Sequence, residues 1–291
     1  MDTAEIEVFL VLAEELHFGR TAERLRLPEP RVSRLVAALE RRTGGALFER
    51  TSRRVRLTPL GQQLASQLRP AKGADAVFLL SSAAPAELAW HRNAIEAAAR
   101  AGVGHLVRSS ILGADPASPA RFIRDHGQAD ELLRVSGVPF TILRPNFYMH
   151  NVTELWPPSL DPRGNYYAPA GEASISMVDA RDVAAVAARV LAGEPAGQAC
   201  DVTGPEALSH ADAAAKLAVS LGRPVRYVPV DDAAARSGLL AAGAGEWLAD
   251  GLVELYQDYR RPDEYAARVH GTVRELTEAE PRTLDQALAD P

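Results

Sequence analysis

The chain has 291 residues, of which 47% are hydrophobic and 24% charged, and its formal net charge is −6. This length allows two domains, and the composition excludes a wholly disordered or collagen-like chain. The single cysteine, Cys200, excludes an internal disulfide framework, and no apolar run reaches the roughly 18 residues of a membrane-spanning helix. The first residues lack the basic flank of a secretory signal, so we expect a cytoplasmic protein.

The first 70 residues predict three helices and a hairpin. Apolar side chains recur with helical spacing over 3–16, and a short helix is expected over 20–25. After the proline-containing stretch at 27–30, a third helix runs to about Arg42. Alternation over 54–57 predicts a half-buried hairpin. We therefore expect a winged helix-turn-helix over residues 1–58, a short linker helix over 59–70, and a separate body over 71–291.

Charge is distributed unevenly along the chain. Residues 17–56 contain 11 arginines against 4 glutamates, whereas residues 71–291 contain 20 basic against 29 acidic side chains. A basic module in front of an acidic body is typical of a nucleic-acid-binding protein. The alternative is an arginine-rich face that is merely solvated.

Short motifs follow one another through this basic module. They are Phe9-Leu10, Ala13-Glu14, Leu16-His17-Phe18, Ala22-Glu23-Arg24-Leu25, Val32-Ser33-Arg34, Leu47-Phe48-Glu49-Arg50 and Leu57-Thr58-Pro59-Leu60-Gly61. Their order and spacing over the first 65 residues resemble the DNA-binding head of LysR-type transcriptional regulators. The resemblance implies a dimer that reads a two-fold site in double-stranded DNA. The long linker helix and sensor domain of that family do not follow here.

A head of this kind presents the N-terminal residues of its recognition helix to base edges in the major groove. Those residues would be Glu29, Pro30, Arg31, Ser33 and Arg34. Arg20 and Thr21 would hold the DNA backbone, and the wing residues Arg53 and Arg54 would meet phosphate or the minor groove. The family usually has Gln where Glu29 stands. A carboxylate can only accept, for example from cytosine N4, so the target should differ from the common half-site.

From residue 75 onward, short apolar strands alternate with helices. Strands are expected at 76–80, 105–109, 140–144, 174–178, 199–202 and 225–230, and helices at 86–101, 121–136, 181–191, 209–221 and 246–260, with a loop over 145–173. A strand–helix alternation of about 30 residues predicts βαβ units and a parallel sheet. The fold class is therefore α/β, with the C-terminal part of the body forming a substrate or ligand subdomain.

The body also carries a series of ordered motifs. They include Asp75-Ala76-Val77-Phe78-Leu79-Leu80-Ser81, Ser136-Gly137-Val138-Pro139, Leu143-Arg144-Pro145, Phe147-Tyr148-Met149, Arg181-Asp182-Val183-Ala184 and Thr203-Gly204-Pro205. They resemble the NmrA-like branch of atypical short-chain dehydrogenases, which implies a Rossmann-type body and NAD(P)(H) as a candidate cofactor. That family opens with a strand and a glycine-rich turn that holds the cofactor pyrophosphate. No such turn is found here, and Asp75 corresponds to the start of the family's fourth strand.

The departure from the family pattern has two expected consequences. The sheet should be incomplete, lacking its first strands and the glycine-rich turn, so dinucleotide affinity should be weak. The strand at 76–80 should be an uncovered edge, which invites pairing with another chain into a homodimer or higher homo-oligomer. A misassembled gene, whose product has no function, is a further alternative.

Residues at the ends of three strands are expected to line one ligand crevice, because ligands of open α/β sheets bind at the strands' carboxyl ends. They are Ser81, Ser82, Ser109, Ser110, Arg144, Pro145, Asn146, Phe147 and Tyr148.

Related dehydrogenases use a Tyr with a Lys four residues later. Here that stretch is His126–Asp130, so no catalytic residue is predicted; His126 is a weak acid–base candidate and otherwise a surface or capping histidine. The histidines show no metal-ligand spacing, and no metal is predicted.

Two functions follow from these patterns. The leading one is a LysR-type DNA-binding regulator whose NmrA-like body senses a small ligand or redox state, or assembles subunits. The alternative is an NAD(P)-dependent oxidoreductase that carries a DNA-binding head. A lack of measurable NADPH binding would exclude the oxidoreductase.

Overall fold

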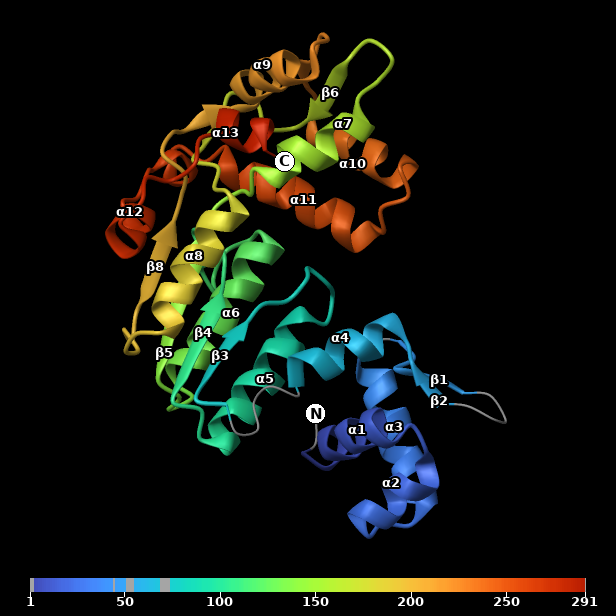
Figure 1. Ribbon diagram of the computed structural model, residues 1–291. Helices are drawn as coiled ribbons and strands as arrows, with labels where there is room; N and C mark the ends of the chain where they lie inside the picture. Colours follow the sequence, from blue (N-terminus) through green and yellow to red (C-terminus); the bar gives the residue numbers. More distant parts are fainter. Residues whose placement is uncertain (1–2, 44, 51–54, 69–73, 291) are drawn as a thin grey trace.

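The computed structural model describes residues 3–43, 45–50, 55–68 and 74–290. The head has the expected elements: α1 (Thr3–Glu15), α2 (Phe18–Leu25), α3 (Glu29–Thr43), the antiparallel hairpin of β1 (Phe48–Arg50) and β2 (Val55–Leu57), and α4 (Pro59–Leu68) (Figure 1). Phe9 and Leu12 of α1 pack against Val32, Val36 and Leu39 of α3 in one core. The apolar stripe on each helix therefore determines which face remains outside.

The body is built on a four-stranded parallel sheet with strand order β3-β4-β5-β8. The strands are β3 (Ala76–Leu79), β4 (His105–Ser109), β5 (Phe140–Pro145) and β8 (Ala199–Val202), and the helices that connect and cover them are α5 (Glu87–Ala101), α6 (Arg121–Arg134) and α8 (Ala180–Leu191). The expected parallel sheet and βαβ units are confirmed. In the described part of the chain, β3 pairs with β4 alone, as expected for an edge strand.

Helices cover both faces of this sheet (Figure 1). Leu106 of β4 lies in a cluster with Ile95 of α5 and Leu133 of α6. The next residue, Val107, lies in the opposite cluster with Val186 of α8. Successive side chains of a strand alternate between faces, so β4, whose five residues are all buried, requires cover on both sides.

The C-terminal part forms a smaller second layer. Its elements are the π-helix at Asn151–Leu155, α7 (Trp156–Ser159), β6 (Asn165–Ala168), β7 (Ser174–Ile175), β9 (Leu208–Ser209), α9 (His210–Leu221), β10 (Arg226–Pro229), α10 (Asp232–Ala241), α11 (Glu246–Tyr259), a 3-10 turn at Tyr265–Ala267, α12 (Thr272–Thr277) and α13 (Leu284–Ala289). β6 pairs with β10 in parallel, and β7 pairs with β9 antiparallel. No described helix is both long and apolar enough to cross a bilayer.

Two expectations for this layer were wrong. The stretch 145–173 is not a loop, because it contains the π-helix, α7 and β6. The strand expected over 174–178 is only two residues long. Its continuation meets the chain after β5 through a single parallel bridge between Tyr148 and Val178 and is not part of β7.

Candidate functional site

The recognition helix α3 presents its polar N-terminus to solvent. Glu29, Pro30, Arg31 and Arg34 are exposed and Ser33 is half-buried, whereas Val32 is buried in the core of the head. Packing of the apolar stripe thus directs the predicted base-reading side chains outward. Arg34 also donates from Nε to the Pro30 carbonyl at 3.3 Å, a weak bond that leaves its terminal nitrogens for a partner.

The residues predicted to contact the DNA backbone lie in different environments. Arg20 is exposed and forms an ion pair with Glu15 at 3.3 Å, so phosphate would have to compete with that carboxylate. Thr21 is fully buried, and its hydroxyl donates to the His17 carbonyl at 2.9 Å. Thr21 is therefore not part of the proposed DNA interface. Arg53 and Arg54 lie outside the described residues.

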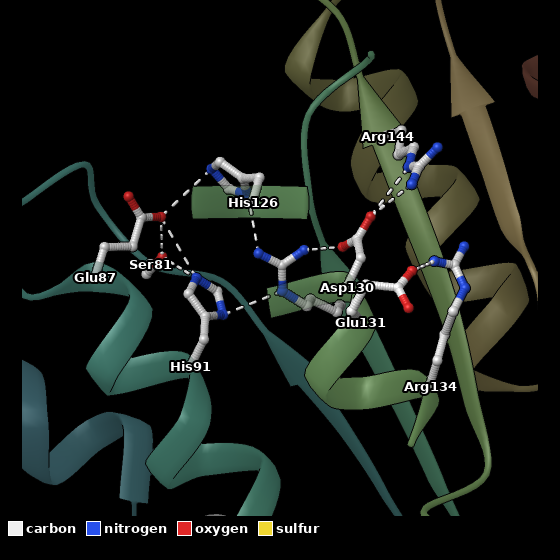
Figure 2. Close-up of polar contacts among 9 residues, drawn as sticks. Ser81, Glu87, His91, His126, Asp130, Glu131, Arg134 and Arg144 are labelled. Carbon is white, nitrogen blue, oxygen red and sulfur yellow. Dashed lines mark hydrogen bonds and ion pairs between the residues drawn. The ribbon is translucent and has the colours of Figure 1, made fainter. Parts of the chain in front are cut away.

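In the body, charged side chains gather between α5, α6 and the sheet (Figure 2). We call this set the polar cluster. It consists of Ser81 after β3, Glu87 and His91 one turn apart on α5, Arg108 on β4, His126 and Asp130 one turn apart on α6, and Arg144 on β5. Residues four apart on a helix share a face, which is why each helix delivers two members to the same place.

Arg108 is the centre of the polar cluster and is fully buried. Its guanidinium donates to His91 Nδ1 at 3.2 Å, to His126 Nδ1 at 2.9 Å and to Asp130. Asp130 also receives two hydrogen bonds from Arg144, at 3.1 and 2.8 Å. A planar guanidinium suits this role because it presents donors in several directions and stays charged.

Glu87 is the second anion of the polar cluster. It accepts from the Ser81 hydroxyl at 2.6 Å, and its Oε1 lies 3.4 Å from Nε2 of both His91 and His126. Burial opposes its charge, but hydrogen bonds from His91 and Ser81 hold the pKa of Glu87 below its usual value. Two carboxylates therefore balance the buried Arg108 and the half-buried Arg144, as a buried charge requires.

This arrangement determines the state of both histidines. Arg108 can only donate, so each Nδ1 must accept, and the ring proton of each neutral imidazole lies on Nε2. Burial, followed by the charge of Arg108, lowers the pKa of His126 to about 3, and burial lowers the pKa of His91. The expectation that His126 is a surface or capping histidine is wrong. It is half-buried and its Nδ1 accepts from Arg108, and its lowered pKa makes it a poor general acid or base at neutral pH.

Sequence reasoning missed Glu87, His91 and Arg108. A signal for them existed, because Arg108 follows the apolar pair Leu106 and Val107 in a strand of the predicted parallel sheet, and a buried charge needs partners. The four-residue spacing of Glu87 and His91 was a second hint, but it is common on helix surfaces.

The buried histidines predict a pH-dependent stability. His126 binds a proton only near pH 3 and His210 only near pH 4 in the folded state, whereas an unfolded histidine does so near 6.5. Between these values unfolding takes up protons, so the free energy of unfolding falls as the pH falls below 6.5. The expected slope is about 1.4 kcal/mol per pH unit for each such histidine.

Urea unfolding between pH 6.5 and about 5, above most carboxylate pKa values, measures this slope. A His126→Gln variant should have a slope shallower by about 1.4 kcal/mol per pH unit. An unchanged slope in that variant would contradict the assignment of His126 as a buried neutral base.

The nine residues expected to line one crevice lie in separate environments. Ser81 and Arg144 belong to the polar cluster, and Pro145 is buried in β5. Asn146 is buried and donates to Ser176 Oγ at 2.9 Å and to the Ala266 carbonyl at 2.8 Å. The remaining residues of the set are Ser82, which is exposed, Ser109 and Ser110, which are buried, and Phe147 and Tyr148, which are half-buried.

Of these nine, Phe147 reaches a cavity of about 590 Å³ in the C-terminal layer. Among the described residues that line this cavity none is charged, and most are aromatic or aliphatic: Phe147, Asn151, Leu155, Trp156, Ser159, Tyr166, Tyr167, Ala168, Pro169, Val230, Ala234, Ala235, Gly238, Leu239, Ala242, Leu252 and Tyr256. Trp156 and Tyr166 stack with ring centroids 4.1 Å apart. A cavity of this volume and lining can hold a small uncharged ligand.

A buried histidine supports the wall of this cavity. His210 contacts the rings of Trp156, Tyr166 and Tyr256, and its Nε2 lies 3.2 Å from the Tyr256 hydroxyl. Burial lowers the pKa of His210 to about 4, so it is neutral. The wall therefore adds a hydrogen bond that fixes Tyr256 without adding charge.

Comparison with known proteins agrees with this two-part description. Residues 3–62 match the bacterial regulatory helix-turn-helix family of LysR type, and residues 52–194 match an NAD(P)H-binding family. The head is similar to the transcriptional regulator IlvR of Caulobacter vibrioides, with 49% identity over 63 residues, which are 22% of this chain and 21% of IlvR.

The body is similar to enzymes. The NAD(P)H azoreductase of Xenophilus azovorans is 38% identical over 214 residues, which are 73% of each chain. The structure of the Escherichia coli quinone oxidoreductase QOR2 in complex with NADPH superimposes with a TM-score of 0.68 and 28% identity, covering 78% of this chain and 79% of that one. The chain therefore belongs to the NmrA-like, NAD(P)H-binding family of atypical short-chain dehydrogenases and carries a LysR-type helix-turn-helix head.

Proposed function

We propose that this protein is a DNA-binding transcriptional regulator whose NmrA-like body senses a small ligand. The observation that carries the proposal is the recognition helix α3, which turns Glu29, Arg31 and Arg34 to solvent while its valines fill the core of the head. The polar cluster also supports the proposal, because the pKa values of its two histidines are lowered and each Nδ1 accepts from Arg108. The body thus holds a network of paired charges at this place, whereas a catalytic site would need a side chain that can donate a proton.

The proposed DNA contacts follow from side-chain chemistry. Arg31 and Arg34 can each grip O6 and N7 of a guanine, and Glu29 can accept from a cytosine N4. Arg20 would hold a phosphate, which fixes the register of the helix without selecting bases. Two heads related by a two-fold axis would read two half-sites about one helical turn apart.

The family implies NAD(P)(H) as a ligand. The described residues would fit the nicotinamide end of this dinucleotide. Ser110, directly after β4, is buried, and its hydroxyl has no partner among the described residues. With Ser109 and Tyr148, it would hold the nicotinamide end. The loop between β3 and α5, residues 80–86, contains no glycine that would let a pyrophosphate approach the helix. When bound, the dinucleotide would supply a redox-dependent signal, with weak affinity because its phosphates are poorly held.

We assign the 590 Å³ cavity to an uncharged aromatic ligand, because its lining offers stacking faces and no counter-ion. Gly238 on α10 lines it, and a Cβ built there meets nothing within 4 Å. Gly238→Leu should therefore fill the cavity without straining the helix. We expect the uncharged fluorescent probe N-phenyl-1-naphthylamine to bind the protein, and this variant to weaken binding at least tenfold.

Gly238→Ala is the matched control, since a methyl group occupies little of the cavity, and its affinity should stay within about threefold of the original. Fluorescence titration measures all three proteins. Equal affinities of the probe for the original protein and the leucine variant would show that the probe binds outside this cavity. That result would contradict the assignment of the cavity to an aromatic ligand.

Fluorescence anisotropy of the full chain on DNA from upstream of its own gene tests the regulator itself. Specific sites are typically bound about 10³-fold or more tighter than other DNA, so a scrambled duplex should bind far more weakly. NADPH added to the complex tests the sensor. Binding that ignores sequence, together with steady NADPH oxidation in the presence of a quinone, would favour the oxidoreductase alternative, which the similarity to QOR2 and the azoreductase supports.

A further inference from the structure

The outer edge of β3 carries backbone groups that have no hydrogen-bond partner among the described residues. The Asp75 carbonyl accepts from the amides of Gly104 and His105 at the start of β4, so residue 75 faces β4. Backbone groups of alternate residues point to opposite sides of a strand, so Val77 and Leu79 also face β4. The amides and carbonyls of the intervening residues, Ala76, Phe78 and Leu80, therefore point away from the sheet.

This edge lacks the devices that normally prevent pairing. Residues 76–80 contain no charge and no proline, and Phe78 and Leu80 are 38% and 56% exposed. Val77 and Leu79 pack into the cluster beneath α5 and α6, which fixes the register of the strand. An apolar, unguarded edge strand is a template for another strand.

We infer that a second copy of this chain covers the edge, with the two β3 strands antiparallel about a two-fold axis at Phe78. In that register Ala76 lies opposite Leu80 of the other copy, so all the outward groups pair, forming about six hydrogen bonds. Asp75 lies opposite Ser81, so the pairing brings no like charges together. The two Phe78 rings become direct cross-strand neighbours on one face.

This register makes the edge self-complementary, which is the requirement for an isologous dimer. The two sheets become one continuous sheet with β3 and its copy at the centre. A helix-turn-helix head that reads a two-fold site needs such an axis. The inference does not depend on DNA binding, however, because it rests on the edge alone.

Sedimentation analysis of the full chain from about 1 to 100 µM tests the inference. We expect a mass twice the 31.2 kDa of the chain. Phe78→Pro removes an outward amide that makes no bond within the sheet, and proline is tolerated at edge positions. Phe78→Lys places two charges side by side across the axis. Each variant should weaken the dimer at least 100-fold.

Val219→Lys is the matched control, since Val219 on α9 is 84% exposed and remote from β3, and its dimer should be unchanged. Amide hydrogen exchange of the unmodified chain provides a second measurement: the Phe78 and Leu80 amides should gain protection with protein concentration. A monomer throughout the range, a dimer indifferent to both Phe78 variants, or protection independent of concentration would each overturn the inference.

Discussion

Replacing both Arg31 and Arg34 with alanine should reduce affinity for the specific DNA site at least 100-fold. Each arginine that grips a guanine contributes about 1–3 kcal/mol of discrimination, and the two lie one turn apart on the exposed start of α3. The head should still fold, because neither side chain belongs to its core. Anisotropy with specific and scrambled duplexes measures the affinity and the selectivity together.

A salt series distinguishes base reading from simple attraction. If the arginines contact phosphates instead of bases, the variant should lose about 0.9 from the magnitude of the log–log salt slope per contact, and specific and scrambled DNA should weaken equally. Arg92→Ala/Arg100→Ala removes the same charge from exposed positions on α5 and should leave binding unchanged. Equal losses in the two double variants would contradict the assignment of α3 as the reading helix.

Asp130→Asn should destabilise the body by about 3–5 kcal/mol, the usual cost of removing one partner from a buried ion pair. The amide keeps the size of the side chain but removes the charge that compensates Arg108 and Arg144 (Figure 2). Arg108 would then remain buried with only Glu87 in its vicinity as an anion. Urea unfolding at pH 7.5, where the histidines are neutral in both states, measures the loss.

The neighbouring residue supplies the control. Glu131 pairs with Arg134 at 3.1 Å on the surface of the same helix, and the Glu131 side chain is 54% exposed. Surface pairs contribute about 0–1 kcal/mol, so Glu131→Gln should change stability little. A loss below about 1 kcal/mol for Asp130→Asn would show that Arg108 finds another partner or water, and would remove the polar cluster as a stabilising element.

Elements with a strong local apolar pattern were predictable from the sequence. The strand expected at 105–109 is β4 over the same residues, and the helix expected at 86–101 is α5 to within one residue. Such signals span a few consecutive residues, because each reflects how one strand or helix divides its side chains between core and solvent. The exposed arginines of α3 were found for the same reason, since they lie on a single helix.

Elements without an apolar face were not predictable. None of the side chains of α10 is fully buried, so its sequence carries no clear period. The π-helix at 151–155 ends where the Trp156 amide bonds to the Asn151 carbonyl, a wider turn that no apolar spacing indicates. Packing against the rest of the C-terminal layer, not local preference, determines both segments.

The sequence by itself determined the two-part plan, the helix that we propose to read DNA, and the absence of charge in β3. Only the tertiary structure decided the partners of Arg108, since His91 lies 17 residues before it and Asp130 lies 22 residues after it. The strand order confirms that β3 is an edge, which the family resemblance had already led us to expect. The physical reason is range: periodic patterns involve neighbours along the chain, whereas charge compensation and sheet order depend on segments that meet only after folding.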